Sequence, residues 1–257
     1  MAITTDWQGN VRAFTFGAGT DWEIDDDGIA GLGIPAARTR DGERGDQDGD
    51  VGGDDTLPRR IIYVPLVGVF ATPGDAWQSL EEDLKVGWAE SNVDLPLDLR
   101  LAGMPTTGRR FFGRPREVSE NLSDLKSGTI RALCTFEALD PLAYGDEVTT
   151  GPSAGTFTVT NAGTKATDRV TLTITGNGGI PRILNNTTDG DDVSFASAVT
   201  GTRVVDLRAH TILDGSGDDA YDELASSSLW FDLAAGANDL TLTGAASLTV
   251  VHRPAYR

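Results

Sequence analysis

The sequence is poor in the side chains that most often carry out chemistry. Its 257 residues include one cysteine, two histidines and two methionines. A nucleophile elbow, a phosphate-binding glycine loop and an HExxH zinc motif are all missing from it. We therefore expect no enzyme and no cofactor or metal site. The 39 Asp and Glu residues leave a glycosidase-type acid pair open as an alternative.

Cysteine is too scarce for a disulfide framework, because a single thiol has no partner within the chain. Cys134 stands in the alternating segment Ile130–Phe136, whose pattern predicts a strand. The sequence places no base beside it, so we interpret it as a small buried apolar residue rather than a nucleophile. A chain of this kind suits a reducing compartment.

Basic side chains and long apolar runs are also scarce. The chain has 21 basic and 39 acidic residues and a net charge of −18, which disfavours a surface that grips nucleic acid or anionic lipid. No apolar run approaches the length of a membrane span, and the N-terminus lacks the basic and apolar regions of a signal peptide. We therefore expect no membrane insertion.

Glycine is abundant, with 31 residues, many of them between short alternating segments. This composition is typical of turn-rich β structure. The residue pattern changes near residue 150. A mixed segment with one amphipathic helix precedes this point, and short strands follow it to the C-terminus. We therefore predict a mainly β chain with two domains, 1–150 and 151–257.

The first domain is predicted to be a β-barrel or sandwich carrying one helix. One or two strands are expected within 2–24, where 11–16 alternates, and further strands at 60–70, 95–101, 109–118 and 128–139, the last two forming a hairpin. The 60–70 segment is nearly all apolar, which predicts a buried strand. Pro65 within it lacks an amide donor and predicts a bulge or an edge position.

The helix of this domain is expected from Asp75 to Glu90. Asp75 followed by Gln78 matches a capping box, so Asp75 is the predicted N-cap. The helix should pack on a sheet through one apolar face, formed by Trp77, Leu80, Leu84 and Trp88.

The second domain is predicted to be an antiparallel β-sandwich, because short strands alternate with turn clusters. Residues 156–160 and 169–176 are expected to be two strands around a turn. Further strands are expected at 180–185, 192–195, 202–206, 211–214, 229–233, 239–243 and 247–253.

The most polar stretch is 38–57, which we predict to be a long loop. Asp46, Asp48 and Asp50 alternate there as the first ligands of an EF-hand do. An EF-hand needs Gly at its sixth position and Glu at its twelfth, and the sequence has Val51 and Leu57. This loop is therefore not predicted to bind calcium.

The segment 109–116 is locally basic and contains Arg109, Arg110, Arg114 and Arg116. Arginine beside phenylalanine can stack on nucleic-acid bases, but in so acidic a chain we favour a protein interface. Guanidinium groups suit planar contacts with carboxylates, and residues 41–55 offer seven. We hypothesise a contact between subunits in which these arginines meet Asp46, Asp48 and Asp50.

Taken in order, several motifs resemble the distal tail protein family of long non-contractile-tailed bacteriophages, which are siphophage tail-tip or baseplate hub components. The first is a polar loop ending in Leu57-Pro58-Arg59-Arg60 before the apolar strand. The second is the helix and the strands that close on Phe136-Glu137-Ala138-Leu139-Asp140-Pro141-Leu142-Ala143-Tyr144. The third is a sandwich with Val159–Thr164, Thr173–Gly176 and Trp230–Asn238.

The resemblance implies an N-terminal belt domain that forms a homohexameric ring and a C-terminal galectin-like sandwich. The ring would join the tail tube protein to the tail-tip, hub or receptor-binding proteins, with DNA passing through its lumen. The expected location is the virion tail, assembled in the host bacterial cytoplasm. We further hypothesise that acidic side chains of residues 1–150 line the lumen and keep DNA from binding.

The alternative function is a carbohydrate-binding module for adhesion to a host surface, since a sandwich can hold sugars on an exposed aromatic ring. The aromatic residues available are Phe157, Phe195, Tyr221, Trp230, Phe231 and Tyr256. Trp230 and Phe231 lie in an apolar segment, so at least one of them is expected in the core. A hydrolase is a third alternative.

Overall fold

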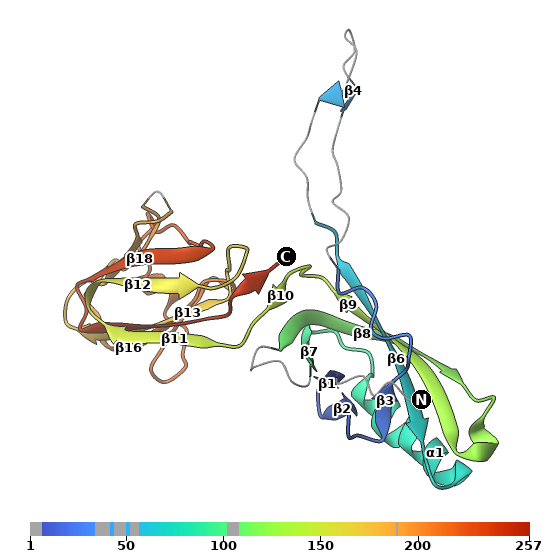
Figure 1. Cartoon of the computed structure of the whole chain (residues 1–257). Helices are drawn as coiled ribbons and strands as arrows, with labels where there is room; N and C mark the ends of the chain where they lie inside the picture. The colour runs from blue at the N-terminus through green and yellow to red at the C-terminus, as the bar shows by residue number, and fades with distance from the viewer. Residues whose placement is uncertain (1–6, 34–41, 44–49, 52–56, 102–107, 189) are drawn as a thin grey trace. The chain divides into compact units, whose positions relative to one another are not determined.

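The computed structural model describes residues 7–33, 42–43, 50–51, 57–101, 108–188 and 190–257 (Figure 1). The chain divides into two compact units, Met1–Ala143 and Tyr144–Arg257. The division falls a few residues before position 150. Strand β11, Val148–Ser153, pairs with β19 of the second unit.

The first unit is built on one strongly curved antiparallel sheet of strand order β2-β1-β7-β8-β9-β6-β3. Its sheet is nearly closed, because the consecutive strands β2 and β3 lie at the two ends of this order and approach each other. This confirms the predicted barrel-like fold with one helical segment. The elements are β1 (Trp7–Val11), β2 (Phe14–Gly17), β3 (Trp22–Ile24), β4 (Gly42–Glu43), β5 (Asp50–Val51), β6 (Arg60–Val69), α1 (Pro73–Ser79), η1 (Leu80–Leu84), α2 (Lys85–Gly87), β7 (Leu95–Leu101), β8 (Arg109–Asn121), η2 (Leu125–Ser127), β9 (Thr129–Ala138) and β10 (Ala143–Tyr144).

The predicted strand 11–16 is wrong as a single element. Val11 ends β1 and Phe14 begins β2, and Arg12 and Ala13 form a two-residue turn between them. Arg12 has φ 52, which is the left-handed conformation that tight hairpin turns use. Val11 pairs with Phe14 across the turn, so the apolar alternation continues through the reversal and conceals it.

Pro65 lies in a regular ladder, so the bulge alternative is wrong. Strand β6 pairs with β9 without a register shift from Arg60 to Val69. On its other side β3 pairs only with Leu66, Val67 and Gly68, and the next contact is Asp25 N–H donating to the Pro65 carbonyl at 2.9 Å. The nitrogen of Pro65 faces the same side, just past the end of β3. Strand β6 lies between β9 and β3 in the sheet order, so the edge alternative is not confirmed either.

The helical segment begins and caps differently from the prediction. Thr72 is the N-cap, and its Oγ1 accepts the Asp75 N–H at 3.1 Å. Pro73 opens the first turn, a favoured position because its missing donor would be unpaired there. The segment passes through a π-helix, η1, and ends at Gly87. The predicted N-cap Asp75 is therefore wrong by three residues.

Three of the four predicted apolar helix positions are buried, namely Leu80, Leu84 and Trp88. Trp77 is wrong, because its side chain is 46% exposed. Ala76 takes its place, since it stands four residues before Leu80 on the same row of the helix.

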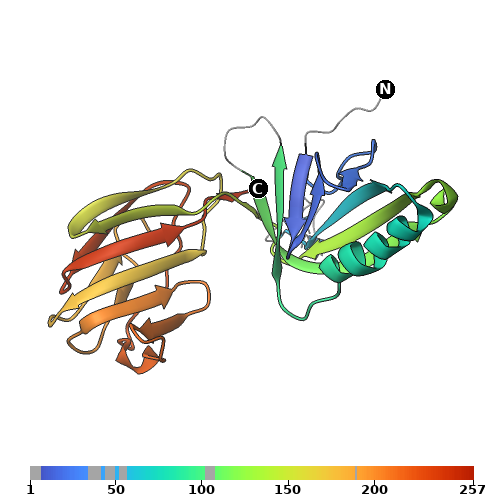
Figure 2. The ribbon, with the colours of Figure 1, turned by 90° about the horizontal axis from the view of Figure 1, so that it is seen from below.

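The core of the first unit forms where the helix lies across the inner face of the sheet (Figure 2). Trp88 packs edge-on against Phe136 of β9 at 6.5 Å, and its indole N–H donates to the Thr135 carbonyl at 3.0 Å. Trp22 donates its own indole N–H to Ser79 Oγ at 3.0 Å. Cys134 is fully buried in this core, and burial raises the pKa of its thiol, as expected for an inert packing residue.

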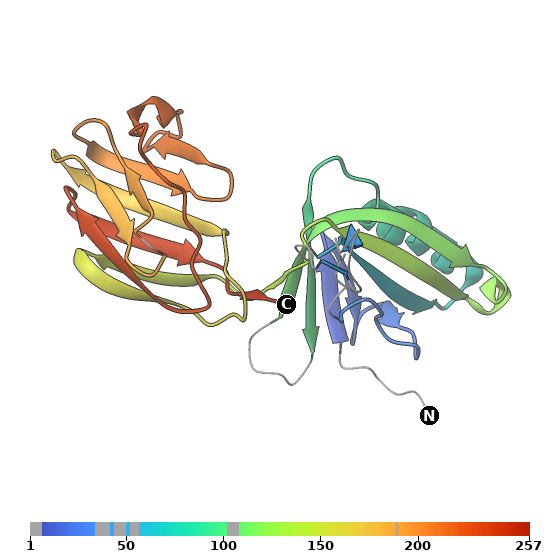
Figure 3. The ribbon, with the colours of Figure 1, turned by 90° about the horizontal axis from the view of Figure 1, so that it is seen from above.

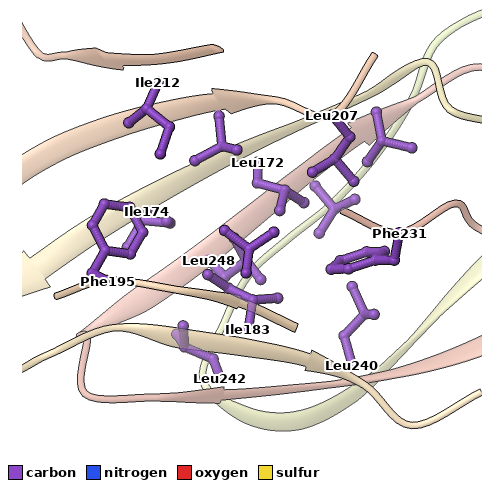
Figure 4. Close-up of a cluster of buried hydrophobic side chains, with 14 of the residues drawn as sticks. Leu172, Ile174, Ile183, Phe195, Leu207, Ile212, Phe231, Leu240, Leu242 and Leu248 are labelled. Carbon is purple, nitrogen blue, oxygen red and sulfur yellow. The ribbon is translucent and has the colours of Figure 1, made fainter. Parts of the chain in front are cut away.

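The second unit is an antiparallel β-sandwich, as predicted (Figure 3). One sheet has the order β11-β19-β13-β16-β17 and the other β12-β18-β14-β15. Both sheets turn apolar side chains into a shared core, in which Leu172 and Leu248 of one sheet meet Ile183 and Leu240 of the other (Figure 4). Its elements after β11 are β12 (Gly155–Asn161), β13 (Val170–Asn177), β14 (Arg182–Asn185), β15 (Asp192–Ser194), β16 (Thr200–Asp206), β17 (Thr211–Asp214), η3 (Tyr221–Glu223), β18 (Gly236–Thr243), β19 (Ser247–His252) and β20 (Ala255–Tyr256).

Two details of the second unit differ from the prediction. Strands β12 and β13 do not form a hairpin, since they belong to different sheets of the sandwich. The segment 229–233 is not a strand, although it buries Phe231 as expected of one member of the Trp230–Phe231 pair. Backbone N–H and C=O groups of this segment are hydrogen-bonded through isolated bridges instead, including the bridge between Thr167 and Leu233.

Candidate assembly surface

The outer face of strands β6 and β9 exposes a row of apolar side chains, which we call the outer stripe. It consists of Ile61, Tyr63, Pro65, Val67, Val69 and Leu133. Ile61, Tyr63, Val69 and Leu133 are between 38% and 69% exposed, and Pro65 and Val67 are partly exposed. Contiguous apolar surface of this kind marks interaction sites more often than scattered single residues do.

The outer stripe follows from a strand that is apolar on both faces. In β6, Ile62, Val64 and Leu66 point inward and are fully buried, so the residues between them point outward. Cross-strand pairing of Pro65 with Leu133 extends the row onto β9. Strands that are apolar on both faces are usually covered on both. Among the described residues of the first unit, the helical segment lies on the inner face and no other element covers the outer one.

Ion pairs accompany the outer stripe. Arg131 of β9, opposite Val67, contacts Asp25 on the other side of β6 at 2.6 Å. At the Ile61 end, Glu137 pairs with Arg59 and, at 2.6 Å, with Arg116. Burial works to raise the pKa of Glu137, but the two guanidinium groups hold it below its ordinary value. Apolar side chains interleaved with charged pairs are common in protein interfaces.

The helical segment forms a second, different surface on the opposite side of the sheet. Its outward face exposes Trp77 and Val86. Lys85 lies over the Trp77 ring at 6.0 Å and pairs with Glu81 at 2.9 Å and Glu120 at 3.2 Å. The first unit therefore has two unlike apolar surfaces, one on each side.

The predicted basic segment is largely paired within its own chain. Arg110 makes a bidentate contact with Asp98, at 2.5 and 2.7 Å. Arg114 contacts Asp94 at 3.0 Å, and Arg116 takes part in the Glu137 pair described above. Arg109 begins β8 opposite Leu99.

The predicted partners of these arginines are three aspartates of the polar stretch 38–57. Asp46 and Asp48 lie outside the described residues, and Asp50 is placed only as the first residue of β5. The contact between subunits at 109–116 therefore stays a prediction. Sequence reasoning overlooked the carboxylates of Asp94 and Asp98. The alternation of 95–101, which sets Asp98 beside the basic strand, was the available signal.

The described residues contain no group of three or more His, Cys, Asp or Glu side chains placed to hold a metal. The side chain of Asp214 stabilises its own turn, because Asp214 Oδ1 accepts hydrogen bonds from Ser216 N at 2.8 Å and Asp218 N at 3.0 Å. These bonds lower the pKa of Asp214. None of the described helices is both long and apolar enough to cross a membrane.

Comparison with known proteins reveals similarity in structure only. Neither a family model nor a curated protein matches the sequence. Among solved structures, the SPP1 Dit protein, described as a paradigm of the hub adsorption apparatus in phages that infect Gram-positive bacteria, gives a TM-score of 0.78 at 18% identity. That superposition covers 98% of this chain and 99% of the other.

Chains of the phage P2 baseplate in its activated conformation, with Ca and with Sr, give TM-scores of 0.64 and 0.63 at 8% and 9% identity. Each superposition covers 96% of this chain and 97% of the baseplate chain. The predicted resemblance is therefore confirmed for the fold of both units.

Proposed function

We propose that this chain is a structural component of the distal end of a phage tail, where it joins the tail tube to the tip or host-attachment proteins. The observation that carries the proposal is the superposition on the SPP1 Dit hub protein, which covers nearly all of both chains. A match to one sandwich alone would be weak, since sandwiches serve many functions. The shared order of a curved sheet with a helix and then a sandwich is far more specific.

In this proposal the first unit forms a homohexameric ring and the second unit is a galectin-like sandwich. A closed ring requires a heterologous interface, in which one face of a subunit meets a different face of the next. The first unit offers two such faces, the outer stripe and the helical surface with Trp77 and Val86. We place the outer stripe in the contact between subunits.

The basic segment is the second proposed contact. Arg114 and Arg116 remain partly exposed while paired, at 30% and 41%. They thus remain open to a further carboxylate from a neighbouring subunit, which the 41–55 segment would supply.

DNA is proposed to pass through the ring without binding to it. The excess of acidic over basic residues in 1–150 supports a lumen that repels the phosphate backbone. Tight binding of duplex DNA to the assembled protein at moderate salt would contradict this part of the proposal.

Electron microscopy of the purified protein tests the ring directly. We expect closed particles with sixfold symmetry and a central opening. Filaments, twofold dimers or compact particles without an opening would each refute the ring. A hydrolase would be revealed separately, by turnover of cell-wall substrates.

A further inference from the structure

Three aromatic rings lie nearly parallel on the surface of the second unit, and we call them the ring cluster. The His210 ring stacks on Trp230 with centroids 4.7 Å apart and planes 11° apart. Tyr221 stacks on the same indole at 6.5 Å and 17°. His210 and Tyr221 are exposed, while Trp230 is half-buried and packs against the sandwich core.

The cluster is held in place by two turns. In the β16–β17 turn, Asp206 Oδ1 accepts from Arg208 N at 3.0 Å and from Ala209 N at 2.9 Å, and His210 follows with φ 54. A left-handed backbone at a residue other than glycine is unfavourable. His210 adopts it at an exposed position, where its imidazole lies flat on Trp230.

Tyr221 is fixed independently, at the start of η3. Asp219 Oδ1 accepts the Tyr221 N–H at 3.0 Å. Three rings from three separate chain segments are therefore arranged before any ligand arrives, and a rigid aromatic surface loses little entropy on binding.

Carboxylates lie beside the rings. Partial burial and the nearby Asp168 raise the pKa of Asp232, while His210 works in the opposite direction, so these three groups share one neighbourhood. Arg208 Nη1 holds Asp168 with contacts of 2.9 and 2.8 Å. The surface thus combines two exposed aromatic residues, His210 and Tyr221, with carboxylate oxygens, of which those of Asp168 are held by Arg208.

We propose that the ring cluster, with Asp232 and Asp168, binds a saccharide that carries no anionic group. The C–H face of a pyranose stacks on the exposed aromatic rings, and carboxylate oxygens accept hydrogen bonds from its hydroxyls. Residues 151–257 contain 12 acidic and 7 basic side chains, which disfavours phosphorylated or carboxylated glycans. The proposal does not depend on ring assembly, because every group lies in one unit of one chain.

Saturation-transfer difference NMR with the full chain tests the proposal. The probes are a panel of neutral oligosaccharides of glucose, galactose and N-acetylglucosamine, together with their sulfated forms. We expect transfer from the protein to the ring C–H protons of at least one neutral probe and none to its sulfated form. Absence of transfer to every neutral probe would overturn the proposal.

Variants locate the site. Tyr221→Ala and Asp232→Asn should each weaken binding of the positive probe by about tenfold. Ile180→Ser, at another exposed apolar position of the second unit, is the matched control and should bind as the wild type does. Unchanged melting temperatures show that the variants are folded. Binding that survives both substitutions, in folded proteins, would place the saccharide elsewhere and refute the assignment.

Discussion

At the scale of single residues, His252 is a titratable group that folding buries. Its ring is buried between the sheets of the sandwich, and Nε2 lies 3.2 Å from the Thr160 carbonyl. Nδ1 has no hydrogen-bond partner among the described residues. Burial lowers the pKa of His252, and the bond to Thr160 offsets this only in part.

This histidine predicts a pH dependence of stability. The unfolded chain binds a proton near pH 6.5, while the folded chain binds it only at a lower pH, so stability is lost as pH falls through 6.5. We expect the melting temperature to fall less steeply between neutral pH and about pH 5 in His252→Gln than in the wild type. Calorimetry at a series of pH values measures both slopes. Equal slopes would contradict the assignment.

The arginines of the basic segment differ in what they do for their own chain. Arg110 and Asp98 are mostly buried by their mutual contact, at 28% and 14% side-chain exposure. The Arg114–Asp94 pair is more exposed and contributes little to stability. Reversing all four arginines at once would therefore mix unfolding with loss of assembly.

A sharper test of the basic segment uses single reversals. Arg114→Glu should weaken the assembly while changing the unfolding free energy by no more than about 1 kcal/mol. Arg110→Glu should instead destabilise the folded subunit, because it leaves Asp98 beside a like charge. Denaturant unfolding and light scattering separate the two effects. An Arg114→Glu protein that assembles normally would remove this segment from the interface.

At the scale of elements, the start of the helix shows why local patterns mislead. Asp75 with Gln78 is a good capping box by sequence, yet the helix begins three residues earlier, where Thr72 precedes Pro73 and accepts the Asp75 N–H. Thr72→Ala should therefore cost about 1 kcal/mol of unfolding free energy. Asp75→Ala should cost less. Denaturant titration of both variants decides, and the reverse order would restore Asp75 as the cap.

The outer stripe gives the most direct element-scale prediction. Val69→Glu and Leu133→Glu place a charge on an apolar surface that is solvent-exposed in one chain, so the subunit should keep its melting temperature. Burying that charge between subunits is costly, and we expect assembly to weaken by at least about tenfold for each variant. Ile180→Glu changes an exposed apolar residue of the second unit, away from both proposed contacts, and is the control. Both variants assembling like the control would exclude the stripe from the interface.

Several elements were predictable because one local pattern determines them. The alternation of 95–101 and of 130–136 gave both the strand and its buried face, including Cys134. The exposure of Tyr63 and Val69 was not predictable. A strand that is apolar on both faces has the same sequence pattern whether its second face is covered within the subunit or by a neighbouring subunit. The pairing of Arg110 with Asp98 depends on sheet register, which a single sequence does not specify.

At the scale of the whole molecule, the sequence predicted the order of the two units. It did not predict which strands of the second unit belong to which sheet. The change of residue pattern near residue 150 separated a helix-bearing sheet from a sandwich. The assignment of β12 and β13 to different sheets depends on long-range pairing, with β12 joined to β18 and β13 to β16 and β19. A short connection between two strands favours a hairpin. In the sandwich, packing of both sheets on the shared core outweighs that local preference for β12 and β13.

The central claim is that this chain exists to assemble with copies of itself, and its mass in solution tests that claim most directly. Native mass spectrometry and light scattering over a range of concentrations should find a particle of six chains of 27.2 kDa each. The Val69→Glu protein should shift towards the single-chain mass under the same conditions. A wild-type protein that keeps the mass of one chain at every concentration would contradict the account.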